Sequence, residues 1–220
     1  MTLALVASPR PLHAQDEECG DECRINSNLA MVVNVPVNPT AQVATAGWGT
    51  IAGVGYNFNK RHALIGEFMW NRIYPNSGTL QAIEAAVQPF GNLGGTADIY
   101  SVTGNYRFEL RGQLFGAYVI GGGGWYLRHT NLSESVTVGT GTVCTPTWLW
   151  WGFTCSSGTV TAGQTLSSST SNVLGGNAGG GVTFRVGKAP YRLYAEARYH
   201  YLPTTNISTQ FVTVALGVRY

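Results

Sequence analysis

Apolar and polar positions alternate with a period of two along much of the chain, and the pattern is clearest just before the C-terminus. Within the stretch from Ile207 to Tyr220, one face carries Val212, Val214, Leu216, Val218 and Tyr220. The other face carries smaller or polar residues and one charge, Arg219. Because successive side chains of a strand point to opposite sides, one face suits hydrocarbon and the other a crowded interior. This pattern is typical of a membrane-barrel strand.

Eight such segments cover most of the chain, each long enough for a tilted strand to cross a bilayer. They lie near residues 28–37, 44–58, 62–74, 98–110, 113–129, 172–187, 190–201 and 207–220. The connectors after the second, fourth and sixth segments are tight, whereas residues 75–97 and 130–171 form long loops, the first with a short helix expected at 80–87. This alternation predicts an all-β, eight-stranded antiparallel transmembrane β-barrel with up-and-down meander topology and periplasmic termini.

Hairpin register predicts which polar side chains face the interior, because opposite residues of an antiparallel pair share a face. Tight turns at 59–61, 111–112 and 188–189 would pair Gly53 with Glu67, Gly49 with Asn71, Gly116 with Arg107, Gly181 with Glu196 and Gly179 with Arg198. Each glycine leaves room for a long side chain, as a narrow eight-stranded interior requires.

The same parity predicts a lumen charge network. Its members are Glu67, Arg107, Glu109, Arg185, Glu196, Arg198, His200 and Arg219. Carboxylates and guanidiniums can neutralise one another where an unpaired charge would be costly, so the network is interpreted as a structural plug. A gated path for ions or small solutes would need this plug to rearrange.

Composition supports a membrane protein that crosses with strands. Only 11% of residues are charged, against about 25% in ordinary soluble domains, and no run of 18 apolar residues could form a helical span. A chain that enters lipid without helices has to close a barrel. A soluble ligand-binding barrel of lipocalin type would need the reverse pattern, with an apolar interior and a charged exterior.

The N-terminal region is expected to lie outside the barrel, which is assigned to residues 27–220. Residues 1–14 contain a short apolar stretch and a small-residue cleavage site, as in a signal peptide, although no Lys or Arg precedes the apolar part, which leaves open a start further upstream. Residues 15–26 are expected to form an acidic, Cys-containing periplasmic tail, because Asp16–Glu22 holds five of the 11 acidic residues.

Several segments carry a resemblance to a known family. They are Gly47-Trp48-Gly49, residues 53–58, residues 121–126, Glu196-Ala197-Arg198-Tyr199 and Leu216-Gly217-Val218-Arg219-Tyr220. On these, the chain resembles the small eight-stranded outer-membrane barrels of Gram-negative bacteria, the OmpA-like and OmpX-like class. The resemblance implies location in the cell outer membrane, contact with its lipid and lipopolysaccharide, and no single activity. It also implies a recognition signal for the barrel-assembly machinery at Val214, Leu216, Val218 and Tyr220, where Tyr220 replaces the more usual terminal Phe.

Four cysteines permit three pairings. If both termini are periplasmic, Cys19 and Cys23 lie on one side of the membrane and Cys144 and Cys155 on the other, so that only the disulfides 19–23 and 144–155 remain. A metal held by Cys19 and Cys23 is the alternative, but no further ligand pair with zinc-like spacing accompanies them. No metal and no cofactor is therefore expected.

The long loop at residues 130–171 contains the densest aromatic cluster of the chain. It consists of Trp148, Leu149, Trp150, Trp151 and Phe153. The cluster either packs against the barrel rim or is displayed as an apolar patch that binds an extracellular partner, a glycan or a neighbouring membrane.

The candidate catalytic residues do not predict an enzyme. Asp98, His129 and Ser133 lie near the outer mouth, but parity sends Asp98 outward, opposite Trp125, and the three do not converge. No basic stripe predicts nucleic-acid binding. The expected role is structural or adhesin-like, with a narrow channel for small solutes or hydrophobic molecules as the alternative and an outer-membrane enzyme as a weaker one.

Overall fold

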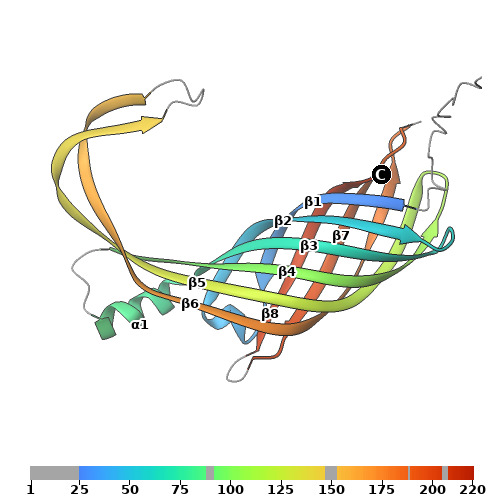
Figure 1. Ribbon diagram of the computed structural model, residues 1–220, viewed down its shortest axis with the longest axis horizontal. Coiled ribbons are helices and arrows are strands. Elements are labelled where there is room, and N and C mark those ends of the chain that lie inside the picture. Colours follow the sequence, from blue (N-terminus) through green and yellow to red (C-terminus); the bar gives the residue numbers. More distant parts are fainter. Residues whose placement is uncertain (1–24, 88–91, 147–152, 188, 205–207) are drawn as a thin grey trace, which may run out of the picture.

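Eight strands close a barrel in sequence order, each antiparallel to its neighbours (Figure 1), which confirms the predicted class and meander topology. The computed structural model describes residues 25–87, 92–146, 153–187, 189–204 and 208–220, with the backbone alone around the tip of the β5–β6 hairpin. The strands are β1 (Ile25–Pro36), β2 (Ala44–Asn57), β3 (His62–Pro75), β4 (Asn92–Arg111), β5 (Phe115–Pro146), β6 (Phe153–Arg185), β7 (Arg192–Leu202) and β8 (Thr209–Arg219). A 3-10 helix, η1 (Thr40–Gln42), follows β1, and α1 (Ser77–Val87) follows β3, close to the predicted helix.

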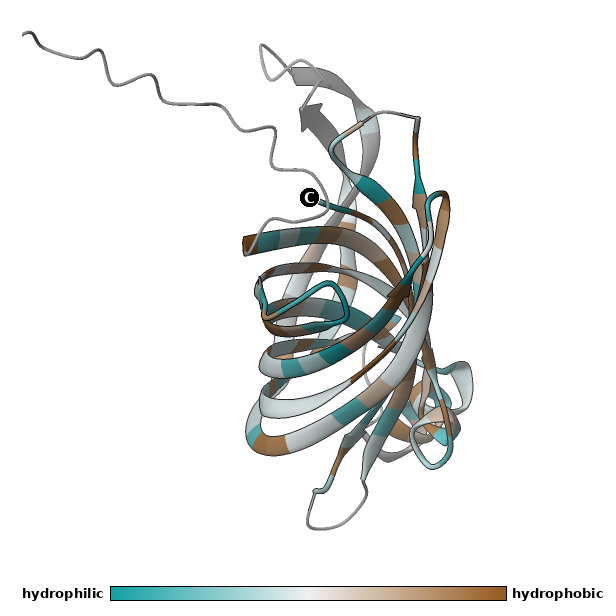
Figure 2. Ribbon diagram, turned by 90° about the vertical axis from the view of Figure 1, so that its right-hand side faces the viewer, coloured by the Kyte–Doolittle hydropathy of each residue, from teal (hydrophilic) through white to brown (hydrophobic). Residues whose placement is uncertain are grey.

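The barrel wall is apolar outside and largely polar inside. Strand β1 alternates exposed and buried residues along its whole length. Hydrophobic and hydrophilic residues are interspersed along the strands of the wall (Figure 2). Outward side chains such as Leu29, Val102 and Leu216 are more than half exposed. An apolar surface that encircles a closed barrel needs lipid around it, because exposure of so much apolar area to water is unfavourable. Within the described residues, neither helix is long and apolar enough to cross a membrane.

The two ends of the barrel differ, and we call them the turn end and the loop end. The turn end holds the β2–β3, β4–β5 and β6–β7 turns and both ends of the described chain, where Ser27 and Tyr220 exchange backbone hydrogen bonds of 3.0 and 2.9 Å. The loop end holds η1, α1, the β7–β8 connection and the β5–β6 hairpin.

The observed register confirms most of the predicted glycine pairs and corrects one. Confirmed pairs are Gly53 with Glu67, Gly49 with Asn71, Gly181 with Glu196 and Gly179 with Arg198. The pair of Gly116 with Arg107 is wrong: Gly116 lies opposite Arg111, and Arg107 opposite Ile120. The β4–β5 turn spans residues 112–115, closed by a 2.7 Å hydrogen bond from the Gly112 amide to the Phe115 carbonyl, and not residues 111–112. The partner of Arg107 is shifted by four residues, an even number, so each side chain keeps its predicted face.

The expected long loop at residues 130–171 is mostly strand. Strands β5 and β6 contain 32 and 33 residues, and their paired ends project beyond the barrel wall as a curved hairpin (Figure 1). The Ser- and Thr-rich sequence of this region can pair as β-structure, but it has no core to face and so lacks the apolar alternation that marks the other strands.

Candidate functional site

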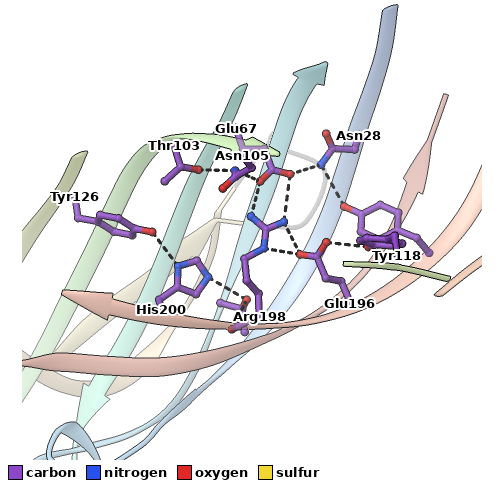
Figure 3. A network of polar contacts seen from close by, with 11 residues as sticks. Asn28, Glu67, Thr103, Asn105, Tyr118, Tyr126, Glu196, Arg198 and His200 are labelled. Carbon is purple, nitrogen blue, oxygen red and sulfur yellow. Dashed lines mark hydrogen bonds and ion pairs between the residues drawn. The ribbon is translucent and has the colours of Figure 1, made fainter. Parts of the chain in front are cut away.

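The centre of the lumen is occupied by one guanidinium held between two carboxylates (Figure 3). Arg198 on β7 donates from Nε to Glu196 Oε1 at 2.8 Å and also forms ion pairs with Glu67 on β3. All three side chains are at most 4% exposed. Three charges this deeply buried are tolerable only because each carboxylate meets the guanidinium and further donors.

Neutral donors complete the coordination of both carboxylates. Asn28 and Asn105 each donate from Nδ2 to Glu67, at 3.0 and 2.7 Å, and the Tyr118 hydroxyl donates to Glu196 Oε2 at 2.8 Å. These partners come from β1, β4 and β5, so five of the eight strands meet in one network. Sequence reasoning did not assign Asn28, Asn105 or Tyr118, although all three share the inward parity of the charged residues.

Inward glycines provide the space for this network. A Cβ at Gly53 would lie 2.7 Å from Glu67 Cγ, and one at Gly181 would lie 2.6 Å from the Tyr118 hydroxyl. Both distances are shorter than real Cβ contacts allow, so glycine is the residue that fits opposite each long side chain.

A second layer lies toward the loop end. His200 stacks on Phe211, with ring centroids 4.8 Å apart, and its Nδ1 lies 3.0 Å from the Tyr126 hydroxyl. Its Nε2 lies 3.3 Å from Thr213 Oγ1. His200, Tyr126 and Phe211 are at most 1% exposed, so aromatic rings fill the lumen at this level.

A third layer lies toward the turn end and is rich in arginine. Glu109 lies 3.3 Å from Arg107 Nε and from Arg219 Nη1, and 3.2 Å from Arg111 Nε. The Arg219 guanidinium also lies between the rings of Tyr118 and Tyr194, at 4.7 and 4.9 Å from their centroids. The remaining member of the predicted network, Arg185, is half-buried next to the β6–β7 turn.

The loop end opens into a cavity of about 700 Å³ between η1, α1 and the barrel rim. Its lining is mixed and includes Ile73, Ile83, Val173, Asn131 and Arg128. Arg128 donates from Nη1 to Thr209 Oγ1 at 2.8 Å. The aromatic residues Tyr126, His200 and Phe211 of the second layer are not part of this lining.

The outer face near the loop end carries a cluster that joins aromatic and charged groups. Arg72 donates from Nε and Nη2 to the two oxygens of Asp98, at 2.8 and 3.0 Å, and Trp70 Nε1 donates to the same carboxylate at 3.2 Å. Trp48 packs edge-on against Trp70, with centroids 5.0 Å apart. An aromatic cluster with polar groups at its edge suits the interface between hydrocarbon and headgroups.

The pairing expected for Asp98 is wrong for the same reason as that of Arg107. Asp98 lies opposite His129, and Trp125 lies opposite Val102. His129 Nδ1 is 2.9 Å from Thr170 Oγ1, and the Ser133 hydroxyl donates to the Gly94 carbonyl at 3.5 Å. Although Asp98 and His129 are register partners, the Asp98 carboxylate is bound by Arg72 and Trp70, and Ser133 is four residues from His129 along β5. The three side chains do not form a catalytic triad.

The other sequence assignments divide between described and undescribed residues. Val214, Leu216, Val218 and Tyr220, the expected assembly signal, form an exposed apolar row on β8 and at the chain end. The backbones of Cys144 and Cys155 lie directly opposite each other in the β5–β6 register. Cys19, Cys23 and residues 147–152 lie outside the described residues, as do the side chain of Phe153 and the boundaries expected at residues 14 and 15.

Solved structures share this architecture, whereas no family model and no curated protein matches the chain. Neisserial surface protein A is 13% identical, covering 90% of this chain and 96% of its own, with a TM-score of 0.50. Ail, the attachment invasion locus protein of Yersinia pestis, is 15% identical over 89% and 97%, with a TM-score of 0.48. The outer membrane protein OprG from Pseudomonas aeruginosa is 9% identical over 91% and 97%, with a TM-score of 0.42.

The fold and the polarity of the wall both indicate a barrel that crosses a membrane. The closed antiparallel meander of eight strands has the fold of Neisserial surface protein A. Its outward face is apolar, and its inner face carries buried charged and aromatic side chains. The chain is therefore a small, closed eight-stranded antiparallel β-barrel with the fold of that protein and an outer face that suits a membrane.

Proposed function

We propose that the protein is a plugged outer-membrane barrel that acts through its surface, in an adhesin-like role, and not through its lumen. Its termini and tight turns would face the periplasm, and its loop end would face outward. The observation that carries the proposal is the β5–β6 hairpin, which projects well beyond the barrel wall. The lumen below it contains buried charged and aromatic side chains.

The hairpin is suited to contact rather than to chemistry. From Ser135 to Phe184 the sequence contains no charged residue, and its projecting part is rich in Ser and Thr with small apolar residues among them. Such a surface favours partners through hydroxyl hydrogen bonds and apolar contact. The aromatic residues within 148–153, which the sequence places between β5 and β6, would supply the large aromatic anchors that dominate binding energy at many interfaces.

The proposal is tested by shortening the hairpin without touching the barrel. Replacing residues 136–162 by Asn-Gly, a sequence that favours tight hairpins, leaves β5 and β6 paired at Ser135 and Gly163. Cells that display the shortened chain should lose attachment to epithelial monolayers and to one another. Unheated and boiled samples should still migrate differently on detergent gels, which verifies the barrel. Attachment equal to that of the full chain would refute the surface role.

Replacing the three tryptophans of the aromatic cluster distinguishes its two interpretations. The variant Trp148→Ser/Trp150→Ser/Trp151→Ser should reduce attachment and leave the melting temperature unchanged if the cluster is displayed. A lowered melting temperature with full attachment would mean that it packs against the protein.

A narrow channel is the second candidate, favoured by the loop-end cavity of about 700 Å³. Its mixed lining would accept a small solute or a hydrophobic molecule. Transport would require the aromatic and charged layers below the cavity to move apart, and conductance in planar bilayers distinguishes this function from the surface role.

A further inference from the structure

The cavity at the loop end combines an apolar wall with a single cation. Its apolar lining includes Ile73 on β3, Ile83 on α1, and Leu132 and Val173 on the β5–β6 pair. Most of its polar lining consists of Ser and Thr side chains. Arg128 is the one charged residue among the described residues that line it, so no described carboxylate belongs to the lining. The cavity is therefore positive at one point and neutral elsewhere.

The guanidinium of Arg128 is oriented by a neutral partner. Arg128 is half-buried on β5, and its Nη1 donates to Oγ1 of Thr209, which is 4% exposed. Within the described part of the chain, no carboxylate lies within ion-pair distance of this guanidinium. Arginine has five N–H donors in a planar fork, so the bond to Thr209 fixes the group and leaves donors for a bidentate anion.

A buried acceptor in the same lining has no donor. The Oδ1 atom of Asn131 is buried and accepts no hydrogen bond from the residues that the structure describes. Asn131 follows Arg128 by three residues on β5, which places their Cα atoms about 10 Å apart. An unpaired buried acceptor is costly, and a ligand with an N–H or O–H group would satisfy it.

Hydrogen bonds tie the walls of the cavity to one another. Thr79 on α1 donates from Oγ1 to the Val43 carbonyl at 3.2 Å, directly after η1. Thr40 in η1 accepts at Oγ1 from the Gln210 amide of β8 at 2.7 Å. These bonds join α1 to the η1 segment and the η1 segment to the barrel. The cavity is therefore formed before any ligand arrives, as in most small-molecule sites.

We propose that this cavity is a binding site for a small amphiphilic carboxylate. The carboxylate of the ligand pairs with Arg128, an N–H or O–H donor of the ligand meets Asn131 Oδ1, and an apolar group lies against Ile73 and Ile83. Acids with the skeleton of an N-acylated amino acid carry all three groups. The volume of about 700 Å³ is within the range of small-molecule sites.

The charge of the lining selects the class of anion. One guanidinium among neutral side chains balances one negative charge, which favours a carboxylate over a phosphate dianion. The ligand is held at the mouth of the barrel, and binding does not require the layers of the lumen to move. The site therefore goes beyond the surface role and does not depend on the projecting hairpin.

Isothermal titration calorimetry of the full chain in lipid nanodiscs tests the site with two probes. N-Benzoyl-leucine carries a carboxylate, an amide N–H and apolar groups, and N-benzoyl-leucinamide differs only in the neutral amide that replaces the carboxylate. Titration of empty nanodiscs corrects for partition into lipid. The unsubstituted chain should bind the acid about tenfold more tightly than the amide, because only the acid forms charged hydrogen bonds with Arg128.

Substitutions of Arg128 and of its partner distinguish ligand binding from a structural role. Arg128→Gln should weaken binding of the acid about tenfold and leave binding of the amide unchanged. Arg128→Lys keeps the positive charge and should retain the preference for the acid. Thr209→Val removes the bond to Arg128 but keeps the guanidinium, so the preference should remain. A purely structural role of Arg128 would instead weaken both probes in both Arg128→Gln and Thr209→Val.

Two further variants test the apolar wall and the net charge. Ile83→Ser should weaken the acid and the amide alike, because both probes lose the same apolar contact. Arg61→Gln is the matched control for net charge, since Arg61 is exposed in the β2–β3 turn at the other end of the barrel. It should change neither affinity. Different migration of unheated and boiled samples verifies that each variant is folded.

Equal affinities of the unsubstituted chain for the acid and the amide would overturn the proposal. A preference for the acid that survives Arg128→Gln, or heats equal to those of empty nanodiscs for both probes, would do the same. The chain shortened at residues 136–162 keeps every residue of the described lining, so it should bind the acid with unchanged affinity whether or not it attaches to cells. Loss of acid binding in the shortened chain would place the site on the hairpin and contradict the proposal.

Discussion

At the residue scale, Glu67, Arg198 and Glu196 act as one electrostatic unit. Arg198→Met would leave two carboxylates buried near each other without a cation, and we expect it to lower the free energy of unfolding by about 3–5 kcal/mol. The variant Glu67→Gln/Arg198→Met/Glu196→Gln removes all three charges and should lose clearly less. Urea unfolding from lipid vesicles, followed by tryptophan fluorescence, measures both. A triple variant less stable than Arg198→Met would contradict the shared-charge interpretation.

The steric role of the inward glycines gives a second prediction at this scale. A Cβ at position 181 would lie 2.4 Å from the Ala195 carbonyl and 2.6 Å from the Tyr118 hydroxyl, whereas at Gly104 it would meet nothing within 4 Å. Gly181→Ala should therefore cost about 1–3 kcal/mol of stability, and Gly104→Ala should cost almost nothing. The same urea unfolding measures the pair, and equal losses would mean that the crowding at Gly181 is relieved by movement of the wall.

At the element scale, the sequence pattern predicts the strands and their faces correctly but misplaces the β4–β5 turn. Alternation identified every strand, because a barrel wall between lipid and a polar lumen imposes the period of two on each. It also placed Gly179 opposite Arg198, since β6 and β7 pair in the expected register. Arg107 was misplaced by four residues, because Gly112 and Phe115 close a wider turn that no apolar pattern marks. The inward Asn28, Asn105 and Tyr118 obey the same parity, but a network predicted from charged residues and histidine does not include them.

The β5–β6 hairpin gives a prediction about cysteine chemistry. Cys144 and Cys155 occupy directly opposite positions, and the Cα separation of such a pair in antiparallel strands is compatible with a disulfide. We expect the bond to form in an oxidising compartment and to stabilise the hairpin tip by about 3 kcal/mol in the chain-entropy model. Mass spectrometry after alkylation without reductant should find both residues unmodified, and Cys144→Ser should make Cys155 reactive. Full alkylation of the unsubstituted chain would contradict the bond.

The cost in stability of introducing a lysine can show whether a strand segment lies in lipid or projects into water. Val102 and Val138 are similarly exposed, at 56% and 62%, but Val102 lies in the barrel wall and Val138 in the projecting part of β5. Val102→Lys should cost about 2–4 kcal/mol, because the ammonium must enter hydrocarbon, whereas Val138→Lys should cost close to zero in water. Unfolding from vesicles compares the two. A similar cost at both sites would mean that the hairpin also lies in lipid.

At the scale of the whole molecule, the three lumen layers decide whether the barrel conducts. The central side chain of each layer, Glu109, Arg198 or His200, is at most 2% exposed. An eight-stranded wall leaves an interior that such side chains can fill completely. We therefore expect no stepwise conductance from the unsubstituted protein in planar bilayers in 1 M KCl, under conditions in which a general porin conducts.

The conductance of the variant Glu67→Gln/Arg198→Met/Glu196→Gln tests whether the central layer alone closes the lumen. The variant removes the charges of the central layer but leaves Glu109 with its arginines on one side and His200 with Phe211 on the other. If each of the three layers closes the lumen independently, this variant should show no stepwise conductance either. Steps that appear only in the variant would assign the closure to the central ion pairs alone, and steps in the unsubstituted protein would favour the channel over the surface role. If neither protein conducts, the outside of the barrel and its projecting hairpin are the surfaces that can contact a partner, and this result favours the surface role.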